Sequence, residues 1–252
     1  TNVPYAKWCT IGKSYSECSD DTNAIPVSNE ETQINTTYHG FYVARYEAGL
    51  TTETLSQSAS TNNKTNTTAV SKPGTKIWNY IDYNNANTVA QAMINNSATY
   101  GTTKSGLITG TQWDTIMKWY QNSNINVDTT QDWGTYRSLT YSGNGKYFTS
   151  KSSGVDKMWS EGTFTRTGNS DSSSYPYYYH VSGLNANGIK KNIADLGGNV
   201  WEWTAEIYST NRVNRGGSAS SSAAGCPASH RSYDSTDNAY FYVGFRAVLY
   251  IQ

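Results

Sequence analysis

Two segments in the first half of the chain place apolar side chains at helical spacing. In the first, from Tyr80 to Ile94, the spacing is i, i+3, i+4 and i+7 and the residues are Ala86, Val89, Ala90 and Met93. Such a pattern gives a helix one apolar face. Asp82 and Asn84 are both suitable caps for its N-terminus. We therefore predict a helix in this segment.

A second helix is predicted directly after the strand-like pair Leu107–Ile108. The apolar positions again repeat at helical spacing, with Trp113, Ile116, Met117 and Tyr120. Thr109 or Thr111 can cap this helix, because a threonine hydroxyl accepts from the first free amides of a helix.

Strand patterns are shorter. Residues 40–47 alternate bulky and smaller side chains, which predicts a strand, and we expect it to pair near the C-terminus. Residues 51–75 are mostly Thr, Asn, Ser and Lys and end in a Lys-Pro-Gly turn signal, so a loop is expected there. Residues 121–188 have no sustained period and predict loops and short strands, with a strand edge at 172–179.

The composition predicts a core that is both aromatic and polar. Hydrophobic residues are 36% of the chain and charged residues 15%, with 21 Tyr and 8 Trp against 5 Phe. Tyr and Trp bury a large ring but keep one polar atom that needs a partner. We expect a core laced with hydrogen bonds.

Charge and hydropathy exclude two classes of partner. The 19 basic and 19 acidic residues give zero formal net charge without a Lys/Arg run, so no nucleic acid partner is expected. No stretch approaches the roughly 20 apolar residues of a membrane helix, so no membrane insertion is expected. The chain begins at Thr1 without a signal-peptide pattern, and we interpret it as a processed protein or an excised domain.

Cysteine usage leaves two readings open. Cys9, Cys18 and Cys226 are an odd number without metal-type spacing. Cys9 and Cys18 either close a small loop as a disulfide or remain buried thiols.

Three blocks near the C-terminus carry the most specific signal. They are Asn-Ile-Ala-Asp-Leu-Gly-Gly-Asn-Val-Trp-Glu-Trp at 192–203, Arg-Val-Asn-Arg-Gly-Gly-Ser at 212–218 and Gly-Phe-Arg-Ala-Val-Leu-Tyr at 244–250. In this order they resemble the formylglycine-generating-enzyme and sulfatase-modifying-factor family. Leu-Ile-Thr-Gly-Thr-Gln-Trp-Asp at 107–114 stands where that family opens its second helix, and the resemblance covers about residues 38–250.

The resemblance implies a fold and a division of the chain. The fold is an α+β, C-type-lectin-like fold of the formylglycine-generating type, loop-rich, with two helices packed on short antiparallel sheets. Residues 38–252 would form this domain, and residues 1–37 an extension that precedes it or packs on it.

The resemblance argues against catalysis. Enzymes of the family bind copper through two cysteines between the Gly-Gly-Ser and Gly-Phe-Arg blocks, and here that interval holds Cys226 alone. The histidines His39, His180 and His230 lie in separate regions without metal spacing. We therefore expect no catalytic residues and no catalytic cofactor, and Cys226 is interpreted as a small buried hydrophobe.

The same resemblance implies a structural calcium ion. Asn199 and Glu202 match positions that supply oxygen ligands to calcium in the family, although calcium takes six to eight oxygens. The alternative is that Glu202 bonds backbone amides beneath Trp201 and Trp203.

Residues 219–243, the C-terminal interval, contain no Lys, Glu, Gln, Met or Trp. Within the interval, short runs of small polar and aromatic residues alternate with expected framework positions. The framework positions are Ala223, Cys226, Ser229, Arg231 and Val243. This pattern resembles the variable proteins of diversity-generating retroelements, in which a reverse transcriptase rewrites adenines in Asn-type codons. The variable region would span about residues 219–242. An ordinary Ser/Tyr-rich loop is the alternative.

The runs supply our candidate ligand-binding residues, which we expect to be exposed on one face: Ser220, Ser221, Ser222, Ala224, Gly225, Ser232, Tyr233, Asp234, Ser235, Tyr240, Phe241 and Tyr242. Tyr offers rigid amphipathic area, and Ser and Gly adapt their hydrogen bonds, as in antibody loops. The sequence therefore predicts a ligand-binding variable protein on a prokaryotic cell surface or a virion such as a phage tail tip, with a protein or glycan partner. The alternatives are a formylglycine-type oxidase and a surface module with an invariant partner.

Overall fold

A computed structural model describes residues 7–8, 25–26, 28–38, 40–50, 58–94, 103–151, 153–156, 158–168 and 175–250. Cys9, Cys18 and His39 lie outside the described residues, so the disulfide prediction is not addressed. Among the described residues, no helix is long and apolar enough to span a membrane.

Both predicted helices are confirmed, with one of the two proposed caps in each case. Helix α3 spans Tyr83–Ala92 and begins after Asp82, whose carboxylate accepts from the amide of Asn85 at 2.8 Å. Helix α5 spans Gly110–Gln121 and begins after Thr109, which forms a reciprocal capping box with Gln112. These local signals define where both helices start.

Two further α-helices among the described residues were not predicted. Helix α1 (Asn29–Thr37) lies in the predicted extension, and α2 (Ala59–Asn62) lies in the predicted loop. The side chain of Glu31 in α1 accepts a hydrogen bond from the amide of Thr111 at 2.5 Å, so α1 packs on the N-terminus of α5. The loop prediction for 51–75 was therefore wrong for α2 and for strand β5 (Ala69–Val70).

A central sheet of four strands carries most of the C-terminal blocks. Its strands are β13 (Trp201–Tyr208), β14 (Asn211–Arg215), β15 (Arg231–Asp234) and β16 (Val243–Phe245), in the order β15-β14-β13-β16. Strands β13 and β16 are parallel, and the other two pairs are antiparallel. The C-terminal interval leaves this sheet after β14 and returns to it twice.

The predicted strand at 40–47 forms as β3 (Phe41–Val43), which pairs with β17 (Ala247–Tyr250) near the C-terminus. This prediction is confirmed. Strand β6 (Lys104–Leu107) pairs with the other edge of β17 and completes a three-stranded sheet.

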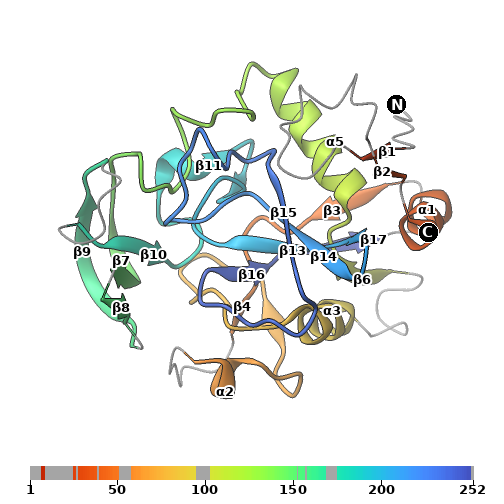
Figure 1. Ribbon diagram of the computed structural model, residues 1–252, viewed down its shortest axis with the longest axis horizontal. Coiled ribbons are helices and arrows are strands. Elements are labelled where there is room, and N and C mark those ends of the chain that lie inside the picture. The colour runs from red at the N-terminus through yellow and green to blue at the C-terminus, as the bar shows by residue number, and fades with distance from the viewer. Residues whose placement is uncertain are drawn as a thin grey trace.

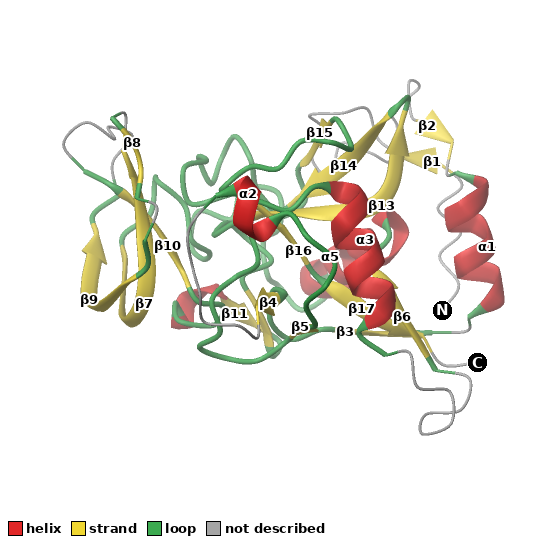
Figure 2. Ribbon diagram, turned by 90° about the horizontal axis from the view of Figure 1, so that it is seen from below, coloured by secondary structure: helices red, strands yellow, loops and turns green. Residues whose placement is uncertain are grey.

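The middle of the chain forms an arm that extends away from the helices (Figures 1 and 2). Its strands are β7 (Tyr141–Lys151), β8 (Gly154–Val155), β9 (Ser160–Arg166) and β10 (Tyr177–His180). The prediction of only loops and short strands was wrong here, because β7 is 11 residues long. The strand edge predicted near 172–179 corresponds to β10, and residues 171–174 lie outside the described part.

Short pairs complete the described elements. They are β1 (Lys7–Trp8) with β2 (Ile25–Pro26), β4 (Gly49–Leu50) with β5, and β11 (Ile189–Lys190) with β12 (Ile193–Ala194), preceded by the 3-10 helix η1 (Ala186–Gly188).

The core is aromatic and hydrogen-bonded, as composition predicted. Four tryptophans are at most 1% exposed, and the indole nitrogen of each donates to a backbone carbonyl. They are Trp78, Trp113, Trp133 and Trp203. Burying these four rings leaves none of their N–H groups unpaired.

Candidate functional site

The C-terminal interval alternates between buried and solvent-facing positions. Of the predicted framework residues, Ala223, Ser229, Arg231 and Val243 are buried, and Cys226 is half-buried. Their side chains hold the interval against the protein core.

None of the twelve predicted ligand-binding residues is buried. Ala224, Gly225, Tyr233 and Ser235 are exposed, and the other eight are half-buried. We call these twelve residues the variable surface. The predicted exposure is thus complete for four of the twelve and partial for eight, and whether they share one face, vary and bind a ligand stays a prediction.

Backbone contacts hold the last run of the variable surface, residues 240–242, in place. The carbonyl oxygens of Tyr240, Phe241 and Tyr242 each accept from a donor outside the interval. The donors are the Tyr80 amide at 2.9 Å, the Asn79 side-chain amide at 2.7 Å and the Trp201 amide at 2.8 Å. None of these bonds involves a side chain of the run.

The other runs are held in a similar way. The Ser221 carbonyl accepts from the amide of Arg137 at 3.0 Å, and the amide of Ala223 donates to Ser138 Oγ at 3.0 Å. The run that starts at Ser232 belongs to β15 and pairs with β14 through the sheet ladder. Side-chain changes at these positions leave such bonds available.

Ring contacts divide the aromatic members of the variable surface into two groups. Tyr240 and Tyr242 stack with centroids 5.0 Å apart, and Phe241 packs edge-on against Tyr242 at 5.0 Å and against Tyr179 at 5.6 Å. Tyr233 instead packs on Tyr208 at 4.6 Å. Burial, together with Tyr240 and Asp234, raises the pKa of Tyr242 to about 12.

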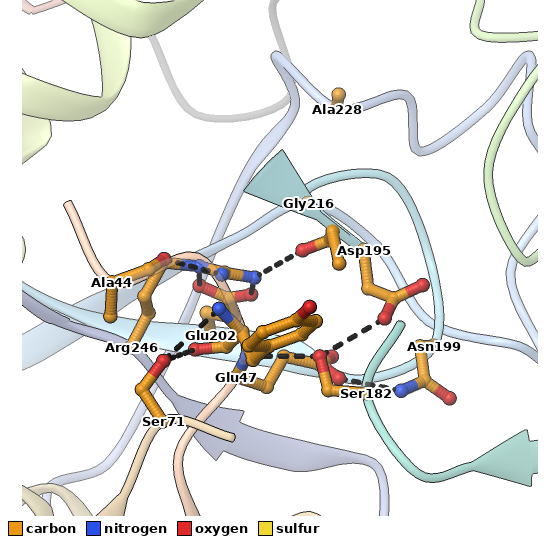
Figure 3. Close-up of polar contacts among 12 residues, drawn as sticks. Ala44, Glu47, Ser71, Ser182, Asp195, Asn199, Glu202, Gly216, Ala228 and Arg246 are labelled. Atoms are coloured by element: carbon orange, nitrogen blue, oxygen red, sulfur yellow. Dashed lines mark hydrogen bonds and ion pairs between the residues drawn. The ribbon is translucent and has the colours of Figure 1, made fainter. Parts of the chain in front are cut away.

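A buried polar cluster joins residues from distant parts of the chain (Figure 3). Arg246 donates to both carboxylate oxygens of Glu202, at 2.9 and 2.6 Å, and also to the carbonyls of Ala44 and Ala194. Two further buried carboxylates belong to Glu47 and Asp195. Of these three carboxylates, Glu202 is the one that pairs with the Arg246 guanidinium, and the charges of Glu47 and Asp195 also act on Arg246.

Hydrogen bonds link Glu47 and Asp195 through neighbouring polar groups. Asn199 donates to Glu47 at 2.7 Å, and Ser182 donates to Asp195 at 3.1 Å and accepts from the Glu47 amide at 3.0 Å. Burial, together with the charges of Asp195 and Glu202, raises the pKa of Glu47 well above its usual range. A proton on Glu47 lowers the charge imbalance of the cluster.

The oxygens of Asn199 and Glu202 do not form a calcium site in this arrangement. Both oxygens of Glu202 accept from Arg246, and the side-chain oxygen of Asn199 accepts from the amide of His180 at 3.0 Å. The Arg246 guanidinium therefore already compensates the charge of Glu202. The alternative reading of Glu202 also needs correction, because its partner is Arg246 and not a set of backbone amides.

A second ion-pair network connects the interval to the sheet and to α5. Arg231 pairs with Glu206, which lies 3.6 Å from Arg215, and Arg215 pairs with Asp114. All four side chains are at most 6% exposed. Arg231 thus fixes the start of β15.

Cys226 lies in a setting that disfavours the thiolate. Its side chain is half-buried, and burial raises the pKa of the thiol. Among the residues that the structure describes, no group of three or more His, Cys, Asp or Glu side chains is arranged to hold a metal ion. His180 is buried against Thr135, and His230 packs on Trp201 at 5.8 Å, so the two described histidines have separate surroundings.

Sequence reasoning missed several residues that organise the site. Glu47, Asp195 and Glu206 are buried carboxylates, and Asn79 and Tyr80 contact the last run. Asp195 lies in the block at 192–203 that resembles the family, so its place in that block was a sequence signal that could have identified it. The others carry no local signal, because their partners are distant in sequence.

Comparison with known proteins identifies the family. The chain belongs to the family of sulfatase-modifying factor enzyme 1-like domains, whose model matches residues 12–251. No functionally curated protein matches the sequence. The α+β, C-type-lectin-like fold expected from the C-terminal blocks is thereby confirmed.

Three solved structures are similar to this fold. Variable protein 1 of Treponema denticola aligns with a TM-score of 0.34 and 18% identity, over 60% of this chain and 50% of that one. The chain thus spans half the length of that protein. CarF aligns with a TM-score of 0.43 and 15% identity over 70% and 68% of the two chains. PvdO from Pseudomonas aeruginosa aligns with a TM-score of 0.47 and 12% identity over 97% and 90%. At these identities the likeness concerns the fold alone.

Proposed function

We propose that this protein is a ligand-binding variable protein, in which the variable surface differs among copies and the lectin-like scaffold does not. Its function would then be recognition, as in the variable proteins of diversity-generating retroelements. One observation carries the proposal: none of the twelve positions expected to vary is buried, whereas four of the five framework positions are buried and the fifth, Cys226, is half-buried.

Tolerance of substitution gives this observation its meaning. A side chain that changes at random cannot be part of the core, because a cavity or an unpaired buried polar group costs about 1 to 5 kcal/mol. That is a large share of the stability of an ordinary domain. Half-buried positions whose backbone is held by outside donors allow replacement at lower cost.

The chemistry of the variable surface suits recognition. The stacked pair Tyr240–Tyr242 and the ring of Phe241 offer rigid aromatic area, and the serines of the first run offer adaptable hydrogen bonds. Aromatic anchors dominate the energy of many interfaces. We propose a protein or glycan partner, met on a cell surface or from a virion.

Membership of the family leaves an oxidase as the alternative function. Copper would need thiolate ligands, and the half-buried Cys226 favours its neutral thiol. The interval offers no second cysteine. We therefore assign Cys226 to the framework and propose that the domain is not an enzyme.

Sequencing the coding segment across a population of the source organism tests the proposal. We expect amino-acid changes at the twelve codons of the variable surface, produced by substitutions at adenines. The codons of Ala223, Ser229, Arg231 and Val243 should remain unchanged and serve as an internal control. Changes spread evenly over both sets of codons would contradict the proposal, and so would an invariant segment without a neighbouring reverse transcriptase gene.

A further inference from the structure

Tyr80 stands out in the segment that precedes α3. Residues 77–83 are all buried except Tyr80, which is half-buried. Trp78 and Ile81, on either side of it, are 0% exposed. The chain therefore passes through the core and presents one ring toward the surface.

The backbone of Tyr80 is unusual for a tyrosine. Its φ angle is +53°, in the left-handed region that glycine and asparagine adopt most readily. Because a bulky residue is disfavoured there, the ring is retained at a cost to the backbone, and such outliers concentrate at functional sites.

Tyr80 and Asn79 also contact the variable surface directly. The Tyr80 amide donates to the carbonyl of Tyr240, and the buried side chain of Asn79 donates to the carbonyl of Phe241. The ring of Tyr80 lies 6.2 Å from the ring of Phe241. The two residues thus set the backbone of the last run and place a further ring beside it.

We propose that Tyr80 is a constant ligand-contacting residue of the binding surface and that Asn79 positions the run beside it. The proposal rests on the proposed function. Tyr80 lies outside the interval that is expected to vary, so each variant of the surface would offer the ligand this same ring. It would supply a fixed aromatic anchor next to changing neighbours.

Two substitutions separate the ring from the backbone. Tyr80→Asn removes the ring but keeps a residue that adopts the left-handed conformation readily. Tyr80→Phe keeps the ring and serves as the matched control. Tyr80→Gly is a second variant without the ring, for use if Tyr80→Asn does not fold.

The binding probe is a dodecapeptide selected from a random phage-displayed library on the wild-type protein. Only peptides that lose affinity for the folded double variant Tyr240→Ser/Tyr242→Ser are kept, so the probe reports on the variable surface. Affinity is then measured by calorimetry, and the melting temperature of each variant is recorded.

We expect Tyr80→Asn to weaken peptide binding by about ten-fold or more. Its melting temperature should be unchanged or higher, and Tyr80→Phe should bind like the wild type. Wild-type affinity in Tyr80→Asn would overturn the proposal, and so would unfolding of both ring-free variants, which would make Tyr80 a structural residue. If the library yields no peptide sensitive to the double variant, the proposed function itself fails, and this inference fails with it.

Discussion

Replacing Arg231 by alanine should destabilise the fold, although the residue lies between two runs of the variable surface. Arg231 is 0% exposed and pairs with Glu206, which is also 0% exposed. Without Arg231, the nearest remaining guanidinium is that of Arg215, 3.6 Å from Glu206 and already paired with Asp114. Two buried carboxylates would then share one cation.

The magnitude follows from the burial of the pair. Removing one partner of a buried ion pair costs about 3 to 5 kcal/mol, because the remaining charge is left uncompensated. An ordinary domain has about 5 to 15 kcal/mol of unfolding free energy. Arg231→Ala should therefore lose about a fifth of the stability or more.

Urea unfolding followed by tryptophan fluorescence measures this loss. The matched control is Ser232→Ala at the next position, which is half-buried and should change the unfolding free energy by no more than about 0.5 kcal/mol. The double variant Glu206→Gln/Arg231→Met should recover part of the loss, because no buried charge is left unpaired. A loss below about 1 kcal/mol in Arg231→Ala would refute the division into framework and variable positions.

Three further predictions concern Glu31, the metal and the thiol. Burial raises the pKa of Glu31 from 4.5 to about 7, although hydrogen bonds from Thr111 oppose the shift, and Asp114 adds to it. The free energy of unfolding should therefore fall by up to about 3 kcal/mol as pH rises from 4.5 to 7, because over this range the folded state keeps a proton on Glu31 that the unfolded state releases. Unfolding of Glu31→Gln measured over the same pH range should not show this fall. A calcium chelator should leave the melting temperature unchanged, whereas Glu202→Gln should lower it, because the pair with Arg246 is weakened. A shift of several degrees on chelation would instead support a bound calcium ion. Copper-dependent oxidation of a cysteine-bearing sulfatase peptide should be absent in the wild type, and turnover that Cys226→Ser abolishes would contradict the non-enzymatic assignment.

Local signals explain which elements could be predicted. The starts of α3 and α5 follow from Asp82 and Thr109, whose side chains bond amides three residues ahead. The spacing of their apolar residues is equally local. The family blocks predicted the framework around Trp203, because those residues are contiguous in the sequence.

Long-range contacts explain what could not be predicted. Helix α1 has no strong apolar face, and Glu31 ties it to Thr111, 80 residues away. Strand β7 contains Gly143 and Gly145, which weaken a strand pattern, but packing of Leu184 against both glycines and pairing with β9 hold it in place. The clusters around Glu47 and Glu206 join residues from distant parts of the chain, so neither is visible in a local window.

Two display libraries test the central claim most directly. One randomises the twelve positions of the variable surface. The other randomises twelve buried positions of the same region: Ala219, Ala223, Pro227, Ala228, Ser229, Arg231, Val243, Gly244, Phe245, Arg246, Ala247 and Val248. The protease resistance of the displayed protein reports whether each library member is folded. We predict that most members of the first library stay folded and most of the second do not, whereas an equal loss of folded members in the two libraries would contradict the account.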